Sequence, residues 1–356
     1  MNKKLIILHS NGKLYFSAVE YLCKENGIKY QHIQTTWFKN FIKLILKKQC
    51  SNCSFKNSLK SFLFFLSVPF IKNKTVIYGT APYDIRFLWY SLLSKKNNFI
   101  YHTSHYKWEN DSESVFNYCC ILPVLKNFWK RKLEKIKIVG VTKAVEKSLK
   151  NILQNKNIYQ IYHSINFKIF YNPRDFKKEK KIKILFVGRM VYEKGLDTVV
   201  DLINRSDPQK YEFTFVGDGK YRKKIEYIFE RENVKYLGWI TDKNKMSQIY
   251  KEHHILLNPS IKIRGWEELF GIVNIEAMAA GMIVIASEHI GPKEIIENNK
   301  NGFLIKEKDV DKIIEIINHL YENRDKMNHI SENASEFAKR FDIKEISEQW
   351  KKVINA

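Results

Sequence analysis

The second half of the chain alternates apolar runs with segments whose apolar residues recur at helical spacing. Residues 182–187 form an apolar run typical of a parallel strand buried on both faces, and residues 195–204 follow with helical spacing. The same alternation predicts strands at 212–216, 234–237, 254–257, 282–286 and 302–305, and helices at 221–232, 241–250, 271–280 and 292–298. This order predicts a parallel sheet with helices on both faces, whose ligands bind beyond the carboxyl ends of the strands.

The first half shows the same alternation less clearly. It predicts a helix at 14–25 and strands at 4–8, 29–33, 75–78, 99–103 and 136–141. The periodicity breaks between residues 165 and 181, where Asn172-Pro173-Arg174 and a lysine-rich run interrupt it. Two Rossmann-like domains are therefore the simplest interpretation, and 356 residues with 44% hydrophobic content are enough to bury two cores.

The net charge of +23 lies almost entirely in the first half of the chain. Residues 1–170 hold 28 basic and 8 acidic side chains, whereas residues 171–356 hold 33 and 30. A basic half attracts polyanions. Composition alone leaves three of them open, namely nucleic acid, an anionic membrane surface and a phosphorylated substrate.

The apolar runs are too short for a signal peptide or a membrane span, and the odd number of cysteines also argues against secretion. The run at 5–8 is shorter than the roughly 7 to 15 residues of a signal-peptide core, and the run at 61–71, interrupted by Pro69, is shorter than the about 20 residues that cross a bilayer. Five cysteines, two of them in the lone motif Cys50-x-x-Cys53, fit a reducing cytoplasm without a zinc site.

The pattern at residues 37–48 favours contact with a membrane surface. On a helix, one face of this segment would be apolar and another would be basic, with Phe38, Phe41, Ile42 and Ile45 on the first and Lys39, Lys43 and Lys47 on the second. That pattern suits an interfacial helix on anionic lipid. A helix packed on the core with its lysines toward water explains the spacing nearly as well.

The most informative stretch runs from Asn258 to Gly281. A strand ends at Asn258, the loop carries Glu267 and Glu268, and a helix begins near Gly271. The free amides and positive dipole of such a helix start bind phosphate. A second carboxylate, Glu276, lies about one and a half turns into the helix, where it can accept hydrogen bonds from sugar hydroxyls.

Two cations flank the same edge of the predicted sheet. Gly188 and Arg189 follow the strand at 182–187, and Lys194 precedes the next helix. A guanidinium can donate two parallel hydrogen bonds to phosphate oxygens, and an ammonium acts as a point charge. The pair can therefore neutralise a diphosphate without a metal ion. A further turn, Gly217-Asp218-Gly219, closes a neighbouring strand on this edge.

These motifs together resemble glycosyltransferase family 4, the retaining nucleotide-sugar glycosyltransferases of GT-B fold. The resemblance rests on Arg189-x4-Lys194-Gly, on the turn at 217–219 and on Glu268-x7-Glu276 followed by Ala-Met-Ala-x-Gly. It covers residues 180–305 strongly and the first half weakly, through Gly12, which lies where the family has a glycine-rich loop, and through His102 at a strand end. The family's linker motif appears only as residues 163–166.

The resemblance implies an α/β GT-B architecture, with two Rossmann-like domains facing a central cleft. An acceptor-binding domain would span residues 1–165 and a nucleotide-sugar domain residues 166–338. The last segment, 339–356, is similar to the family's final helix, which returns to the first domain.

The resemblance also implies roles for individual residues. Glu276 would hold the ribose, and Glu268 would contact the transferred sugar. His102 would lie near the reacting sugar, although His105 competes for this role. The diphosphate would contact Gly12, Gly188, Arg189, Lys194 and the backbone of Leu269, Phe270, Gly271 and Ile272.

The predicted function is that of a retaining hexosyltransferase in cell-surface polysaccharide or glycolipid synthesis. It would transfer the sugar from a UDP- or GDP-sugar to a lipid-linked glycan acceptor in the cytoplasm, at the inner face of the cell membrane. It would need no metal and bind no nucleic acid. A GT-B epimerase or phosphorylase remains an alternative. A basic nucleic-acid-binding protein would explain the charge but not Glu268, Glu276 or the cation pair.

Overall fold

A computed structural model describes residues 4–10, 14–36, 55–106, 108 and 122–356. Gly12 and the predicted membrane-contact residues Lys39, Lys43 and Lys47 lie outside the described residues. The chain divides into two compact units. The first comprises residues Met1–Ser164 with Ile343–Ala356, and the second comprises Ile165–Asp342.

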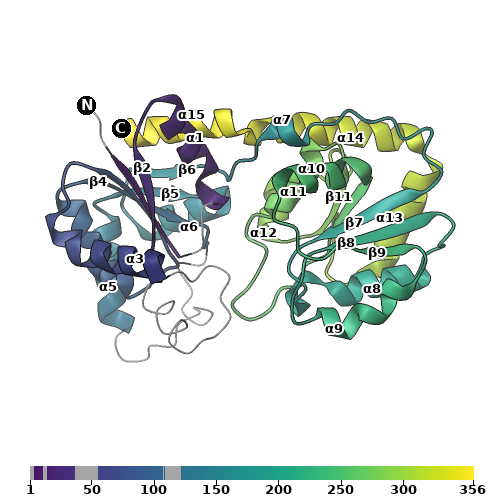
Figure 1. The fold of residues 1–356 in the computed structure, drawn as a ribbon, viewed down its shortest axis with the longest axis horizontal. Coiled ribbons are helices and arrows are strands. Elements are labelled where there is room, and N and C mark those ends of the chain that lie inside the picture. The colour runs from purple at the N-terminus through teal and green to yellow at the C-terminus, as the bar shows by residue number, and fades with distance from the viewer. Residues whose placement is uncertain (1–3, 11–13, 37–54, 107, 109–121) are drawn as a thin grey trace. The chain divides into compact units, whose positions relative to one another are not determined.

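The first unit is built on a six-stranded parallel sheet with the order β2-β1-β3-β4-β5-β6 (Figure 1). Its strands are β1 (Leu5–His9), β2 (Tyr30–Gln34), β3 (Thr75–Gly79), β4 (Asn98–Thr103), β5 (Lys137–Gly140) and β6 (Ile158–Gln160). The five strands predicted in this half are confirmed, with ends within one residue. The sixth, β6, was not predicted, because three residues are too few to show a period.

Alternate residues of these strands enter two separate cores. Ile6 and Leu8 pack on one face of the sheet, whereas Leu5 and Ile7 pack on the other. The described helices of this unit are α1 (Ser17–Glu25), α3 (Phe55–Ser67), α4 (Arg86–Tyr90), α5 (Leu122–Leu133), α6 (Lys143–Ile152) and α15 (Ile343–Asn355). Side chains of α1 and α15 fill the second core, in which Trp350 of α15 is almost completely buried.

The second unit contains another six-stranded parallel sheet, with the order β12-β11-β10-β7-β8-β9. Its strands are β7 (Ile182–Val187), β8 (Tyr211–Val216), β9 (Val234–Tyr236), β10 (Ile255–Asn258), β11 (Ile283–Ser287) and β12 (Phe303–Ile305). All six were predicted from the sequence, and each end agrees within one residue. Because every pairing is parallel, the carboxyl ends of all six strands meet at one edge.

Helices cover this second sheet on its two faces (Figure 1). They are α7 (Phe167–Phe170), α8 (Leu196–Arg205), α9 (Arg222–Ile225), α10 (Lys243–Glu252), α11 (Ile272–Ala279), α12 (Ile290–Ile295), α13 (Val310–Glu322) and α14 (Arg324–Ala338). The helix predicted at 221–232 is shorter, since α9 gives way to a 3-10 turn at Glu226–Glu230. No helix in the described part of the chain combines the length and apolar character needed to cross a membrane.

The second unit ends at Asp342, four residues beyond the boundary expected from the sequence. The side chain of Phe341 is buried, and its ring lies 6.0 Å from that of Phe270, measured between centroids. Its carbonyl accepts a hydrogen bond of 3.0 Å from the backbone of Ile165. These contacts hold the turn Lys339–Phe341 in the second unit, so only α15 joins the first.

Packing of α15 makes a prediction for the stability of the first unit. Trp350→Ala removes a buried ring that contacts Phe16 and His102, and should lower the free energy of unfolding by about 3 to 5 kcal/mol. Urea denaturation followed by far-UV circular dichroism measures this loss. Lys351→Ala, at an exposed neighbouring position, is the matched control. Equal stability of the two variants would show that α15 contributes little to this core.

Candidate active site

The loops at the carboxyl edge of the second sheet approach one another backbone to backbone. A Cβ atom on Gly217, which follows β8, would lie 1.8 Å from the carbonyl oxygen of Gly188, which follows β7. A Cβ atom on Gly195 would lie equally close to the carbonyl oxygen of Pro259, after β10. Both glycines also have a positive φ, 135° and 70°. Only glycine fits these positions, which fix the loops that carry the candidate residues.

Lys194 and Glu268 are brought into direct contact by this arrangement. The Lys194 ammonium donates a hydrogen bond to the Glu268 carboxylate, and both side chains are largely buried. The same ammonium lies 5.0 Å from the centroid of the Trp266 ring. Lys194 therefore has an anionic partner within the protein itself.

Arg189 is far more accessible. Its side chain is 56% exposed, and Nη2 lies 3.6 Å from Oε1 of Glu193 on the following turn. An ion pair at 3.6 Å with one solvent-exposed member contributes little to stability. The guanidinium can therefore turn toward a ligand at low cost.

The backbone of Glu268 is held by a histidine that the sequence analysis did not identify. The Glu268 N–H donates to Nδ1 of His289 at 3.1 Å, and the Glu268 carbonyl accepts from the Gly291 N–H at 3.0 Å. Because Nδ1 accepts, the ring proton belongs on Nε2, which lies 3.0 Å from Oε1 of Glu307. This contact joins loops after β10 and β11, so no local spacing signals it.

Residues 269–272 form the entry to α11. Gly271 is the residue before the helix, and the first amides of a helix have no partner within it. The positive end of the helix dipole lies at the same place. Below this entry, the buried Asn274 accepts a hydrogen bond of 3.0 Å from Asn258, and its Nδ2 has no hydrogen-bond partner among the described residues.

Glu276 lies farther along α11, where its carboxylate is sheltered from water. The Tyr250 hydroxyl, from α10, donates to its Oε2 at 3.0 Å. Burial raises the pKa of Glu276 to about 7, and the hydrogen bond from Tyr250 partly opposes this rise. Tyr250 was not identified from the sequence, because its contact with Glu276 depends on how two helices pack.

His102 lies inside β4 of the first unit and is only 5% exposed. Its ring packs against those of Phe16 and Trp350, with centroids 4.9 and 5.9 Å away. Burial lowers the pKa of His102 well below its usual value, and the neighbouring His163 and His9 lower it further. The imidazole is therefore neutral near pH 7.

His105, the alternative candidate, follows the end of β4 and is only partly buried. Its backbone N–H donates to Oγ1 of Thr103 at 3.2 Å, and its carbonyl accepts from Nε1 of Trp108 at 2.7 Å. These bonds fix the backbone of His105. As a whole residue, His105 is more exposed than His102.

Comparisons with known proteins agree with this arrangement. Residues 168–337 match a family model described as glycosyl transferases group 1. An uncharacterized glycosyltransferase of Methanocaldococcus jannaschii is 32% identical over 207 residues, which cover 58% of this chain and 55% of that protein.

A second relative is named for its acceptor and for the sugar that it transfers. It is the GalNAc-alpha-(1->4)-GalNAc-alpha-(1->3)-diNAcBac-PP-undecaprenol alpha-1,4-N-acetyl-D-galactosaminyltransferase of Campylobacter jejuni. It is 25% identical over 186 residues, which cover 51% of this chain and 50% of that protein. This chain thus spans about half the length of both relatives.

A likeness over nearly the whole chain is found with a solved structure, that of the Anabaena protein HepE in complex with UDP. The two chains are 18% identical and superimpose with a TM-score of 0.71 over 99% of each. At this identity the likeness shows the fold alone. It confirms the predicted GT-B fold of two Rossmann-like parallel-sheet domains.

The raised pKa of Glu276 predicts a distinctive effect of pH on stability. Since the native carboxyl holds its proton up to about pH 7 and an unfolded one only to about 4.3, Glu276 stabilises the fold at low pH, and this contribution is lost as the pH rises through 7. The difference in stability between wild type and Glu276→Gln should therefore shift toward the variant between pH 5 and 8.

Urea titrations across this range measure that difference. Glu252→Gln, at an exposed position on α10, is the control and should follow wild type at every pH. If wild type and Glu276→Gln keep a constant difference, the Glu276 carboxyl is not sheltered from water.

Proposed function

We propose that this protein is a glycosyltransferase that takes its sugar from a nucleoside diphosphate donor. The observation that carries the proposal is the Lys194–Glu268 contact beside the entry to α11. A cation, a carboxylate and a helix start at one sheet edge suit a ligand with both phosphates and sugar hydroxyls. These residues also lie within the segment that matches group 1.

Donor binding would exchange the partners of this pair. A diphosphate competes for the Lys194 ammonium, because it carries more negative charge than one carboxylate. Glu268 would then be free to accept hydrogen bonds from hydroxyls of the transferred sugar. Arg189, whose own side chain is exposed, would reach the phosphates, together with the amides of residues 269–272 and Gly188.

Glu276 would bind the ribose of the donor. Tyr250 donates to Oε2, so Oε1 remains available for a ribose hydroxyl. A hydrogen bond to an ionised carboxylate is stronger than one to its protonated form. Donor binding should therefore favour ionised Glu276.

The reaction would proceed with retention of the anomeric configuration. The bond between the anomeric carbon and the phosphate oxygen breaks, and a bond to the acceptor oxygen forms on the same face. The proton of the acceptor hydroxyl passes to the departing phosphate. Negative charge grows on that phosphate, so Arg189, Lys194 and the start of α11 would lower the barrier without a metal ion or a protein nucleophile. His102, or its alternative His105, would contact the reacting sugar.

The acceptor would be a glycan carried by a membrane lipid, and the transferred group a hexose. The undecaprenol named for the Campylobacter relative and the basic first half of this chain both support this proposal. UDP is supported by the ligand named for HepE, with GDP as the alternative. The enzyme would work in the cytoplasm at the inner face of the membrane, where contact through Lys39, Lys43 and Lys47 stays a prediction.

Removal of either cation tests the diphosphate site. Arg189→Ala or Lys194→Ala should weaken the binding of UDP or GDP about tenfold to a hundredfold, since a charge-assisted hydrogen bond contributes about 1.5 to 3 kcal/mol. Isothermal titration calorimetry measures this change. Lys223→Ala, an exposed site on α9, should bind like wild type. Unchanged affinity in both cation variants would disprove this assignment.

Chelation tests whether these cations replace a metal ion. Transfer from the nucleotide sugar should continue in excess EDTA, because Arg189, Lys194 and the α11 amides would stabilise the negative charge of the leaving diphosphate. The rate is measured as release of UDP or GDP. Loss of transfer in EDTA, with recovery on adding magnesium, would contradict the metal-free mechanism.

A further inference from the structure

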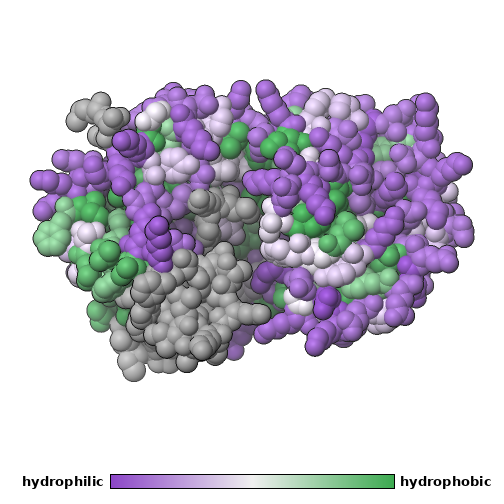
Figure 2. All heavy atoms as spheres, in the orientation of Figure 1, coloured by the Kyte–Doolittle hydropathy of each residue, from purple (hydrophilic) through white to green (hydrophobic). Residues whose placement is uncertain are grey.

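An apolar stripe lies on the outward face of α3 in the first unit. Leu59, Leu63, Leu66 and the following Phe70 are 44%, 56%, 50% and 81% exposed. The spacing of Leu59, Leu63 and Leu66 places them on one side of α3, and Phe70 follows in the 3-10 turn Val68–Phe70. Figure 2 shows hydrophobic side chains at the surface over the part of the first unit that contains α3 and α5.

The opposite side of α3 packs against the core of the first unit. Ser58, Ser61 and Val68 are buried, and the Phe65 ring stacks on Trp89 at a centroid distance of 5.1 Å. The outward leucines are therefore not required to hold the helix in place. Exposed apolar side chains grouped in this way mark an interaction surface.

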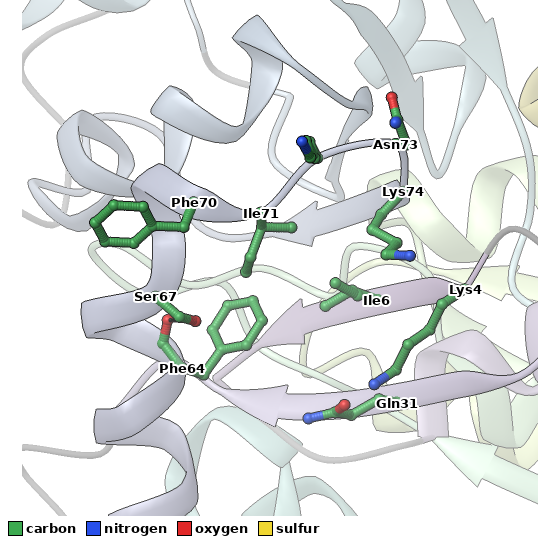
Figure 3. A pocket seen from close by; sticks show the side chains of 10 residues that line it. Lys4, Ile6, Gln31, Phe64, Ser67, Phe70, Ile71, Asn73 and Lys74 are labelled. Atoms are coloured by element: carbon green, nitrogen blue, oxygen red, sulfur yellow. Dashed lines mark hydrogen bonds between the residues drawn. The ribbon is translucent and has the colours of Figure 1, made fainter.

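A lysine-lined pocket of about 560 Å³ adjoins the end of this helix. Its walls combine the apolar side chains of Ile6, Phe64 and Ile71 with the cations Lys4, Lys72 and Lys74. Figure 3 shows Phe64, Ile6 and Ile71 around the opening, with Lys4 and Lys74 on the strand side and Phe70 pointing away from the strands.

Among the described residues, no carboxylate neutralises these lysines. No acidic residue lines the pocket, and none of Lys4, Lys72 and Lys74 forms an ion pair with another described residue. Two more exposed lysines, Lys56 and Lys60, flank the apolar stripe. Cations and apolar side chains thus share one surface, called here the α3 surface: the stripe Leu59, Leu63, Leu66 and Phe70 with the pocket lysines.

We infer that the α3 surface binds an anionic phospholipid bilayer, with the pocket lysines on lipid phosphates and the stripe inserted among the headgroups and acyl chains. A bilayer presents phosphates and hydrocarbon within a few ångströms of each other, which matches this mixture. Nucleic acid would leave the leucines in water. A second copy of the chain would bring lysines against lysines, which is unfavourable.

The pocket lies at the amino ends of β1 and β3, where Lys4 and Lys74 directly precede the strands. The opposite, carboxyl edge of the sheet holds His9 at the end of β1 and His102 of β4, which pairs with Gly79 at the end of β3. Five residues at about 3.3 Å each separate the two edges by roughly 16 Å. A lipid bound at the α3 surface therefore leaves the carboxyl edge of this sheet uncovered.

Vesicle sedimentation of the full chain, without donor or acceptor, tests this inference independently of the proposed transferase activity. Wild type should bind vesicles of equal phosphatidylglycerol and phosphatidylcholine and bind pure phosphatidylcholine much less. The triple variant Lys4→Gln/Lys72→Gln/Lys74→Gln should bind roughly a hundredfold more weakly at low salt, about fivefold for each lysine. Leu63→Gln/Leu66→Gln should lose the part of the binding that resists salt.

The control Lys223→Gln/Lys235→Gln/Lys245→Gln removes the same charge from exposed positions of the second unit. It should retain most of the binding, and circular dichroism checks that each variant is folded. Equal binding by wild type and both α3-surface variants would overturn the inference. An equal loss of binding in the control variant would also overturn it. The same holds if the protein forms a dimer without vesicles and Leu63→Gln/Leu66→Gln dissociates this dimer but leaves vesicle binding unchanged.

Discussion

Close backbone packing at the carboxyl edge of the second sheet is the constraint on which the candidate site depends. Gly217 lies against the Gly188 carbonyl and Gly195 against the Pro259 carbonyl, at separations that exclude any side chain. The first contact fixes the loop that carries Arg189, and the second joins the loop of Lys194 to the segment that leads to Glu268. The charged side chains thus stand on a rigid backbone frame, which keeps them in place before a ligand arrives.

The charged groups of the site are paired with each other in a way that a ligand could replace. Lys194 and Glu268 neutralise each other in a largely buried position. Glu276 accepts a hydrogen bond from Tyr250, and burial raises the pKa of its carboxyl. Removing charges from water is costly, so these groups pair with one another or shift their pKa. A phosphate with neighbouring hydroxyls could satisfy both charges of the Lys194–Glu268 pair at once. This electrostatic fit is the physical basis of the proposed donor site.

The sequence predicted the strands well because a buried parallel strand leaves a local mark, a short apolar run between polar turns. β7 matches its predicted ends, and the motif residues Gly188, Lys194 and Glu268 lie in the loops between a predicted strand and the next predicted helix. The missed features depend on distant contacts. Tyr250 meets Glu276 only through helix packing, His289 meets Glu268 only where two loops join, and the buried ring of His102 depends on α15.

The central claim is that the edge of the second sheet holds the diphosphate of a nucleotide sugar. A crystal structure of the chain with UDP or GDP tests it most directly. The account predicts phosphate oxygens within hydrogen-bond distance of Lys194, Arg189 and the amides before α11, a ribose hydroxyl on Glu276, and separation of Lys194 from Glu268. A nucleotide bound elsewhere, or bound here with the Lys194–Glu268 contact intact and no phosphate near α11, would contradict it.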